Sequence, residues 1–534
     1  MDEDSNDHID HINDHNHHIH PQLENNRLSI FQKISFSVGH VFNDLCAAFW
    51  FTYLLIYMHS VNGFSSRTAG TLMLIGQIAD GLATPFVGIE CDRHLDWFIC
   101  NYGRRKCWHF IGTICVFFSF PFLFNHCFDC ENSTENAQIV YYSAFIIIFQ
   151  FGWASVQISH LSLIPDLTPV SSERIELNAY RYACTVFANI TIYLMMLFVL
   201  DFNDKIHPNG SSQIGPSDDD TFRIVSFIVI IIGFVFSAIF HIGTREKPNR
   251  SVYEEDDYSD SDAIVTKIRP MNWRNWFQQS QFYIVALLYM GTRLTINLTQ
   301  VYVPNYLQET LRLPKKSIAY IPLVTYTSGF LSSFIMKYVN GKLGKKMTFF
   351  LGTIIAISAC VWIYFGNDTN FKSYGIFAVS ILIGVSSSTM LITSLAITND
   401  LIGKNTASGA FVFGAMSFVD KVSNGLAIMI IEYFKPCRSH SKIGCQYYRD
   451  ILMFVCSGAT VICIISLAML STQKIGRLTK RPIHDYQSRN PPDFFTNLTI
   501  STSPSRQSSS SSGRSSMIED GQSSLLKPLL GESN

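Results

Sequence analysis

Charged side chains are scarce in this chain. Only 15% of its 534 residues are Asp, Glu, Lys or Arg, whereas 48% are hydrophobic. Soluble globular domains carry about a quarter charged residues, so this composition excludes an ordinary soluble protein. The formal net charge is −1, and a nucleic-acid-binding domain would need a strongly basic surface. We therefore expect the chain to lie in a lipid bilayer and to have no nucleic-acid partner.

Two chemical signatures are also missing. The sequence contains no nucleophile–base pair and no set of metal ligands on one side of the predicted membrane segments. We therefore expect neither an enzyme nor a metal or other cofactor. The chain does not open with a basic start, a short apolar core and a small-residue cleavage site, so the first spanning segment is expected to insert as its own signal.

Long apolar segments dominate what the chain does contain. A helix that crosses the bilayer core needs about 20 predominantly apolar residues. Twelve segments meet this requirement, at roughly 34–58, 69–91, 107–124, 139–163, 179–200, 222–242, 280–302, 318–338, 347–365, 374–397, 408–433 and 451–471. The predicted fold is an all-α membrane protein with twelve transmembrane helices in two pseudo-symmetric six-helix bundles.

Composition divides the chain into five regions. They are, roughly, a disordered His-rich cytosolic tail (1–27), an N-terminal six-helix bundle (28–243), an acidic cytosolic linker (244–276), a C-terminal six-helix bundle (277–473) and a disordered Ser-rich cytosolic tail (474–534). Metal binding by the His-rich tail is conceivable from composition, but no fixed spacing holds its ligands, so we expect a solvated tail. The last tail contains Leu525-Leu526 after Glu519-Asp520. This end resembles an acidic dileucine signal, with a spacing one residue longer than usual, and predicts a sorting adaptor as partner.

A charged hairpin recurs in both halves of the chain. The first copy reads GIECDR from Gly88 and YGRRKCW from Tyr102, and the second reads NGKLGKK from Asn340. In both copies glycines turn the backbone, and cations follow just before the next apolar run. A second echo places Asp166 and Asp400 in the corresponding loops 4–5 and 10–11. Internal repeats of this kind are typical of secondary transporters, whose two halves rock against each other.

Basic residues indicate the orientation, because they accumulate in cytoplasmic loops. If both termini are cytosolic, the cations of the 2–3 loop, the linker, the 8–9 loop and the last tail lie inside: Arg93, Arg104, Arg105, Lys106, Arg245, Lys247, Arg250, Lys342, Lys345, Lys346, Lys474, Arg477, Lys480 and Arg481. The glycosylation sequons at Asn132, Asn209 and Asn367 then lie outside the cell or in a lumen. Loops 7–8 and 11–12, on the opposite side, also contain basic residues, so the excess of cations on the cytosolic side is present but incomplete.

Two cysteine pairs lie in loops on the same predicted face as those sequons. Cys127 and Cys130 share the 3–4 loop, and Cys437 and Cys445 bracket the 11–12 loop. Disulfides form in oxidising compartments, so both pairs are candidates. By spacing alone, Cys127 and Cys130 would also suit a redox or metal pair.

Ionisable and strongly polar side chains lie inside the predicted spans, where each costs several kcal/mol. The main examples are His40, Asn43, Asp44, Gln77, Asp80, Gln150, Gln157, His160, Arg181, Arg293, Asn297, Gln300, Asp420, Lys421 and Asn424. Carboxylates and cations on different helices can enclose a solvated, charge-balanced cavity between the halves. Asp44 and Asp80 lie deepest, and protonation or ion binding would remove their burial cost, as cation coupling requires.

Several of these residues have an alternative interpretation. Gln150 and Gln157 share one helix face and either form interhelical hydrogen bonds or line the cavity. Arg181 either faces the cavity or extends its head group to the cytosolic interface. Asp420 and Lys421 project about 100° apart on a helix, so one can neutralise a neighbour while the other faces solute.

The membrane portion, roughly residues 28–475, resembles the major facilitator superfamily. Within it, the DR…GRRKCW signature of the 2–3 loop resembles the glycoside–pentoside–hexuronide cation symporter branch. The resemblance implies that Asp44 contacts the solute, that Asp80 serves the coupling ion, and that Arg181 and Lys421 occupy functional positions of that branch. The chain departs from the pattern at Thr84 and Gln157, where the branch has carboxylates. A sodium site built from several carboxylates is therefore doubtful, and proton coupling through Asp80 or uncoupled exchange fits better.

Longer runs resemble one subgroup of this superfamily: GHVFNDLC from Gly39, GQIADG from Gly76 and FGWASVQISHLSLIP from Phe151. This resemblance implies a multi-pass carrier that moves cysteine from the cytosol into lysosomes and, in pigment cells, melanosomes. An amino group needs a carboxylate, and a carboxylate needs Arg or Lys, so the polar residues suit a zwitterion and would equally suit a sugar acid. The alternatives are a cation-coupled sugar or lysolipid symporter, and a membrane sensor or scaffold that does not transport.

Two groups of residues complete the predicted site. The expected solute-binding residues are Asp44, Asn43, Gln157, Arg181, Arg293 and Lys421, with Asp80 as the ion-coupling residue. The expected gating residues of the 2–3 hairpin are Asp92, Arg93, Arg104, Arg105 and Lys106, whose ion pairs would form in one state and break in the other.

Overall fold

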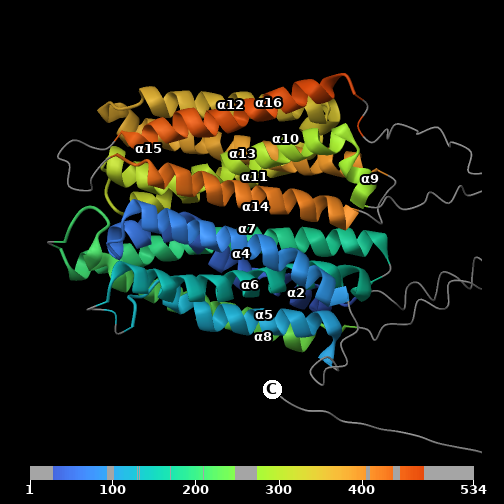
Figure 1. The fold of residues 1–534 in the computed structure, drawn as a ribbon, viewed down its shortest axis with the longest axis horizontal. Coiled ribbons are helices and arrows are strands. Elements are labelled where there is room, and N and C mark those ends of the chain that lie inside the picture. The colour runs from blue at the N-terminus through green and yellow to red at the C-terminus, as the bar shows by residue number, and fades with distance from the viewer. Residues whose placement is uncertain are drawn as a thin grey trace, which may run out of the picture. The chain divides into compact units, whose positions relative to one another are not determined.

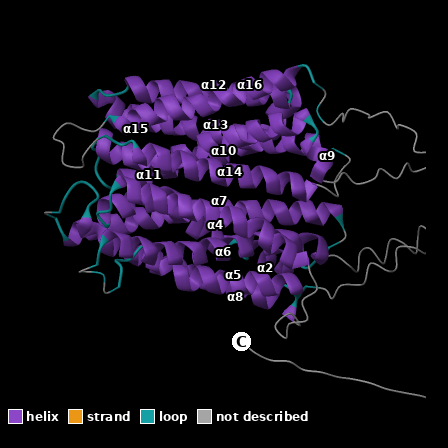
Figure 2. Cartoon of the chain, in the orientation of Figure 1, coloured by secondary structure: helices purple, strands orange, loops and turns teal. Residues whose placement is uncertain are grey.

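The computed structural model describes residues 28–92, 102–128, 130, 133–168, 170–208, 210–246, 273–403, 409–436, 446–473 and 475. All regular secondary structure in these ranges is helical (Figure 2). The predicted N-terminal tail, most of the linker and nearly all of the C-terminal tail lie outside them. All of the described residues belong to one compact unit.

The first half of the chain supplies six long helices that are apolar enough to cross a membrane. The first crossing combines α2 (Ile30–Val38), α3 (Val41–Ile56) and the π-helical turn η1 (Tyr57–Val61). The next five are α4 (Ser66–Asp92), α5 (Arg104–Leu123), α6 (Glu135–Leu167), α7 (Ser171–Ile206) and α8 (Asp219–Gly243), the last preceded by η3 (Pro216–Asp218). These helices form the N-terminal bundle.

The second half repeats this pattern. A short helix α9 (Trp273–Phe277) precedes α10 (Ser280–Asn305) with its π turn η5 (Tyr306–Thr310). The remaining elements are α11 (Ser317–Leu343), α12 (Lys345–Phe365), η6 (Phe371–Gly375), α13 (Ile376–Ile402), α14 (Gly409–Tyr433), α15 (Tyr447–Asp450), η8 (Ile451–Cys456) and α16 (Ser457–Ser471). The described residues thus contain twelve candidate spans, which confirms the predicted fold class.

Several helices are longer than the apolar segments from which they were predicted. The fourth and fifth spans contain 33 and 35 residues, and at 1.5 Å per residue each is about 50 Å long. The hydrocarbon core is only about 30 Å thick. The sequence therefore located the apolar part of each helix, whereas the polar ends continue as helix beyond it.

The local backbone repeats between the two bundles. The first helix of each bundle ends in a π turn, where Asn62 N donates to Tyr57 O at 2.9 Å and Leu311 N donates to Tyr306 O at 3.0 Å. The glycines that precede the third helix of each bundle, Gly103 and Gly344, have φ of 123° and 77°, a region that glycine reaches without steric cost. The sequence echo is therefore also a structural repeat.

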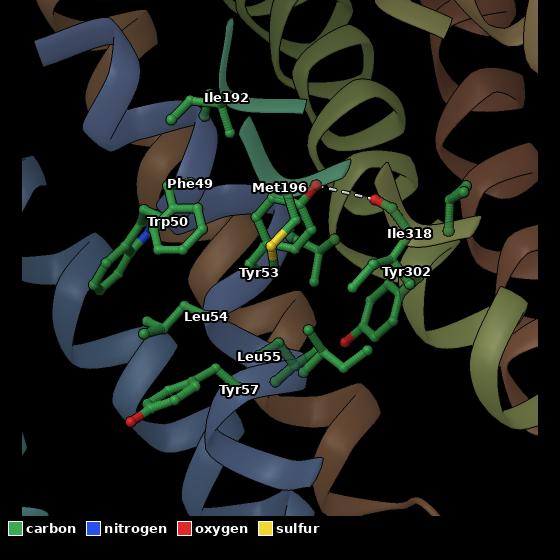
Figure 3. Close-up of a cluster of buried hydrophobic side chains, with 14 of the residues drawn as sticks. Phe49, Trp50, Tyr53, Leu54, Leu55, Tyr57, Ile192, Met196, Tyr302 and Ile318 are labelled. Atoms are coloured by element: carbon green, nitrogen blue, oxygen red, sulfur yellow. Dashed lines mark hydrogen bonds between the residues drawn. The ribbon is translucent and has the colours of Figure 1, made fainter. Parts of the chain in front are cut away.

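The two bundles meet along three helix pairs, α4 with α14, α7 with α11, and α3 with α10. Figure 1 shows α14 running between α7 of the N-terminal half and the other helices of the C-terminal half. One buried apolar cluster crosses this interface and includes Tyr53, Leu54 and Tyr302. Within it, Tyr53 OH donates to Ile318 O at 3.0 Å (Figure 3). Packing and interhelical hydrogen bonds are the forces that hold helices together in lipid.

Candidate substrate-translocation site

A cavity of about 280 Å³ lies between helices of the two bundles. One wall comes from α7 and the others from α10, α11 and α13. Its polar lining residues are Tyr182, Thr185, Asn189, Thr299, Gln300, Thr325, Tyr326, Ser387 and Ser388. None of these carries a formal charge at neutral pH, so the predicted charged residues lie behind this lining rather than in it.

Asp44 lies directly behind the cavity wall. Its Oδ2 atom accepts a hydrogen bond from Thr185 Oγ1 at 2.8 Å and lies 2.9 Å from His40 Nδ1. Asp44 is only 8% exposed, and Thr185 itself lines the cavity. The Thr185 side chain therefore separates this carboxylate from the cavity.

Asp80 pairs with Lys421 across the bundle interface. The Nζ atom of Lys421 lies 2.6 Å from Asp80 Oδ1 and donates to Thr84 Oγ1 at 2.7 Å. The three residues join α4 to α14, and Asp80 and Lys421 are 2% and 8% exposed. The structure therefore brings the predicted coupling carboxylate together with a predicted solute residue. Thr84, which stands where the symporter branch has a carboxylate, is part of the same contact.

Arg293 pairs with Asp420 inside the C-terminal bundle. Arg293 Nε donates to Asp420 Oδ2 at 2.9 Å, and Asn424 donates to Asp420 Oδ1 at 2.6 Å. Asp420 thus neutralises a neighbour, while the adjacent Lys421 points across the interface. The 100° offset between adjacent helical residues explains why the two side chains have different partners, but Lys421 neutralises Asp80 and does not line the cavity as predicted.

The other predicted solute residues have different surroundings. Asn43 donates to Trp153 O at 3.2 Å. Within the described structure, Gln157 makes no side-chain hydrogen bond. The Nε atom of Arg181 is buried and has no hydrogen-bond partner there either. Arg181 is one helical turn from Thr185 on α7, and Asp44 acts electrostatically on its guanidinium.

The predicted gating cations contact their own bundle in this state. Arg105 lies 2.6 Å from Asp166 and donates to Ser162 O. Lys106 is 4% exposed and donates to His241 O and Thr244 O at 3.1 and 2.6 Å. Asp92 ends α4, Arg104 opens α5, and Arg93 lies outside the described residues.

The second hairpin makes the equivalent ion pair. Lys345 Nζ lies 2.7 Å from Asp400 Oδ1, just as Arg105 lies against Asp166. Each pair links the start of the third helix of a bundle to the end of its fourth helix, so the two aspartates lie in helices rather than in the predicted loops. The repeated aspartates noticed in the sequence are therefore the partners of the repeated cations, a relation that sequence reasoning did not predict.

Cross-bundle ion pairs gather at the opposite end of the helices, which carries Val61, Ile206 and Thr310. Lys315 lies 2.9 Å from Asp204 and 2.8 Å from Asp218. Lys316 lies 2.7 Å from Asp201. The two lysines follow the first helix of the C-terminal bundle, and the three aspartates belong to the N-terminal bundle. We call these five residues the latch.

Further contacts close the same end. Lys435 donates to Glu309 at 2.8 Å and to His59 Nε2 at 3.2 Å. The guanidinium of Arg67 lies 4.5 Å above the ring of Tyr433. Sequence reasoning missed the latch and these contacts. The only available signal was charge of opposite sign in the loops 5–6 and 7–8.

Electrostatics favours the latch in its closed form. Burial opposes the charge on Lys315, but hydrogen bonds to Asp218 and Asp204 outweigh it and raise its pKa above the usual 10.5. A hydrogen bond to Asp201 raises the pKa of Lys316 in the same way. Both lysines therefore remain charged throughout the neutral range.

The loops bear on two further predictions. Cys127 and Cys130 form a disulfide, which confirms that prediction. Asn367 is exposed in the loop between α12 and η6, whereas Asn132, Asn209, Cys437 and Cys445 lie outside the described residues.

Comparison with known proteins places this geometry in a family. The model of the "MFS/sugar transport protein" family matches residues 35–477. The chain is 46% identical to "Major facilitator superfamily domain-containing protein 12" of Homo sapiens over 458 residues, which cover 84% of this chain and 95% of the human one. It is 44% identical to the Mus musculus protein of the same name, over 83% and 94% of the two chains.

More distant relatives and solved structures agree on the fold. An isoprimeverose transporter of Lactiplantibacillus pentosus is 24% identical over 63% of this chain and 64% of its own. A D-xylose–proton symporter structure superposes with a TM-score of 0.59 at 14% identity, covering 83% of this chain and 96% of its own. An inward-facing, unoccupied bacterial homologue of the human lysosomal transporter Spinster gives the same values. The chain belongs to the MFS/sugar transport protein family, a family of membrane transporters within the major facilitator superfamily.

Proposed function

We propose that this transporter carries cysteine, or a similar small zwitterion, from the cytosol into lysosomes or related organelles by alternating access. The observation that carries the proposal is the proximity of a carboxylate and a guanidinium, since Asp44 lies behind Thr185 in the cavity wall and acts electrostatically on Arg181. A carboxylate suits the amino group of an amino acid, and a guanidinium with a free donor suits its carboxylate. The sequence runs at Gly39, Gly76 and Phe151 resemble the subgroup of "Major facilitator superfamily domain-containing protein 12", the name carried by the 44–46% identical relatives.

The size of the cavity supports a small solute. Its volume of about 280 Å³ falls below the range of roughly 300–1,000 Å³ for pockets that hold drug-sized ligands. An amino acid fits such a space, whereas a lysolipid chain needs a longer one. The closed latch at the opposite end implies a state that awaits solute from the linker end, next to Gly243 and Trp273. We infer that this linker end faces the cytosol.

Proton coupling is proposed at Asp80. A proton on Asp80 would remove its attraction for Lys421, which would free the interface between α4 and α14 and release the lysine toward a solute. The pair cannot stay intact while the two helices separate, so its protonation state is linked to the transition between states.

A sugar is the second candidate. Hydroxyl and amide side chains such as Asn189, Gln300 and Ser388 line the cavity, and they suit a polyhydroxylated solute as well as a zwitterion. A relative named as an isoprimeverose transporter is 24% identical to this chain. The substrate test must therefore include a sugar arm.

Uptake by the purified protein in liposomes tests the substrate. Radiolabelled L-cysteine is offered with and without a pH gradient, and xylose is offered in a parallel arm. We expect saturable cysteine uptake that Asp44→Asn abolishes and the exposed control Asp368→Asn leaves unchanged. Xylose uptake without cysteine uptake would support the second candidate. Binding of either solute without uptake would support a sensor, and undiminished uptake by Asp44→Asn would remove Asp44 from the site.

The cellular location is a separate proposal. Cytosolic termini would place Asn367, and the sequons at Asn132 and Asn209, on the lumenal side, where they can be glycosylated. They would also leave Leu525-Leu526 available to a sorting adaptor. Glycosidase sensitivity of single sequon variants tests the orientation, and cell-surface appearance of a Leu525→Ala, Leu526→Ala variant tests the sorting signal.

A further inference from the structure

Four histidines of the N-terminal bundle form a continuous series. His40 precedes α3, and His109, His160 and His241 lie on α5, α6 and α8. Neighbouring rings in the order 241, 109, 160, 40 have centroids 4.9, 5.9 and 5.6 Å apart. His40, His109 and His160 are at most 3% exposed. Such a set of buried titratable rings is more than helix packing requires.

One end of the series reaches the linker end of the bundle, through Tyr102. His109 Nε2 lies 3.1 Å from Gly39 O, and a carbonyl only accepts, so this nitrogen carries the proton. The other nitrogen of His109 must then accept from His241 Nε2, which lies 3.1 Å away. This leaves His241 Nδ1 as an acceptor 3.0 Å from the hydroxyl of Tyr102, which also donates to His241 O at 2.9 Å. Tyr102 is 45% exposed, so rotation of its hydroxyl proton from the carbonyl to Nδ1 would connect the series to the protein surface.

The other end of the series reaches Asp44. Asn43 Nδ2 lies 3.3 Å from His40 Nε2 and donates to it. The proton of the neutral His40 ring is therefore on Nδ1, which faces Asp44 Oδ2 at 2.9 Å. Within the described residues this Nδ1 atom makes no aligned hydrogen bond, so a small rotation of the His40 ring would bring its proton onto the carboxylate behind the cavity wall.

His160 bridges the two ends. Its Nε2 atom donates to Phe36 O at 2.7 Å, and its ring stacks on Phe36 with centroids 4.2 Å apart. Its Nδ1 atom is buried and accepts no hydrogen bond within the described residues. Buried polar atoms are rarely left without a partner. A vacant acceptor between His109 and His40 is the position at which a proton passing between them would rest.

We propose that His241, His109, His160 and His40 relay protons between the linker end of the N-terminal bundle and Asp44, by a route outside the solute cavity. A proton that arrives on His241 Nδ1 displaces the Nε2 proton of that ring to His109 Nδ1. His109 then passes its Nε2 proton to the vacant Nδ1 of His160 after a ring rotation. His160 passes its Nε2 proton to His40, and His40 releases its Nδ1 proton to Asp44. One proton enters and one leaves, so every ring ends neutral.

The charges around the four histidines favour transfer of a proton through the rings over its accumulation on any one of them. Lys106 on α5 acts electrostatically on His241, and Lys106 itself is influenced by Arg245 after α8 and by Glu246 as a partial counter-charge. Arg181 on α7 acts on both His40 and His160, opposite Asp44. Two flanking cations oppose a resident positive charge on the rings, whereas Asp44 provides the sink. The route would let Asp44 exchange protons with the linker side even when the cavity is open to the other side.

The relay deepens the proposed function, because it gives a proton-coupled carrier a separate proton path. Its test therefore uses a readout that needs no solute. After a light-triggered release of caged protons, time-resolved infrared spectroscopy follows the C=O stretch of protonated Asp44, which is identified by its loss in Asp44→Asn. The matched variants are His160→Gln, whose amide can still donate to Phe36 O, and the exposed control His207→Gln.

We expect His160→Gln to slow the rise of this band at least about tenfold, because a positioned proton-transfer side chain contributes about 10²–10⁴-fold to rate. His207→Gln should match the wild type, and His109→Gln should repeat the effect if His160→Gln folds poorly. Equal rates in the wild type and a folded His160→Gln protein, or no Asp44 band at any pH from about 4 to 8, would overturn the relay. Cysteine uptake by the same proteins tests the substrate separately. If the wild-type protein takes up no cysteine, the carrier proposal is rejected, but the infrared measurement of proton transfer still stands.

Discussion

Lys421 of α14 holds Asp80 of α4 across the interface between the two bundles, with 2.6 Å between Nζ and Oδ1. Both side chains are at most 10% exposed. Removing one partner of a buried ion pair costs about 3–5 kcal/mol, because the other charge stays buried without compensation. The pair is therefore both a structural contact and a point where protonation acts on the interface.

A double-mutant cycle measures this coupling. We expect Lys421→Met and Asp80→Asn each to lower the thermal unfolding temperature of the protein in lipid nanodiscs. The double variant should regain most of the loss, because no unpaired charge remains. Additive losses in the double variant would show that the two side chains do not stabilise each other.

The pH dependence of transport tests Asp80 as the proton carrier. Asp80→Asn removes the titrating carboxylate, so the uptake rate should lose most of its variation between about pH 5 and 8. Lys345→Gln is the control, because it breaks an ion pair inside one bundle and leaves Asp80 untouched. A wild-type pH profile in Asp80→Asn would assign the coupling proton to another group.

The latch should set the balance between the two states of the carrier. Lys315→Met removes the contacts with Asp204 and Asp218 and leaves the buried Asp218 without its cation, which disfavours closure. Spin labels at the exposed positions His207→Cys and Asn367→Cys report the separation of the bundles at this end. We expect a longer mean distance in Lys315→Met by electron double resonance. A control variant that removes the surface cation Lys372 should leave the distance unchanged.

The raised pKa values of Lys315 and Lys316 predict how closure depends on pH. A lysine whose pKa is higher in the closed form stabilises that form fully below its ordinary pKa of 10.5, and this contribution disappears as the pH rises through the raised value. The lysines therefore contribute equally to closure from about pH 7 to 9. The same spin-label distance should stay constant over that range and lengthen above about pH 10.5. Lengthening already near pH 8 would show that the lysines are not held charged by their aspartates.

Close packing of α5 on α6 depends on two glycines. A Cβ atom on Gly112 would lie 2.7 Å from Gly152 O, and one on Gly152 would lie 2.8 Å from Gly112 O. Gly112→Val should therefore destabilise the N-terminal bundle by roughly 1–3 kcal/mol, as overpacking does. Gly88→Ala is the control, because a Cβ there meets no atom within 4 Å. Thermal unfolding in nanodiscs measures both, and an equal effect of the two changes would contradict the packing argument.

Local patterns were enough for the fold and for much of the site. Hydropathy located all twelve spans among the described residues, because a membrane helix must be apolar over a fixed length. The charged hairpins revealed the repeat. The cost of burying a charge singled out Asp44, Asp80 and Arg293, each of which has a charged or titratable partner in the structure.

Local sequence patterns could not predict which charged residues pair with each other in the folded protein. Asp80 and Lys421 are 341 residues apart in the chain, and no sequence pattern around either residue identifies the other as its ion-pair partner. The uncharged lining of the cavity was also missed, since serine, threonine and asparagine in a helix look alike whether they face a cavity or a neighbouring helix.

By itself, the sequence determined the number of membrane helices, their division into two related halves and the set of side chains too costly to leave unpaired. These are properties of single segments, because hydrophobic length and the price of a buried charge do not depend on distant residues. Only the tertiary structure decided that Lys421 meets Asp80, that Arg181 keeps a free donor beside Asp44, and that Lys315 and Lys316 close the end away from the linker. Those outcomes follow from how two rigid bundles pack against each other, and that packing brings together groups that the chain keeps far apart.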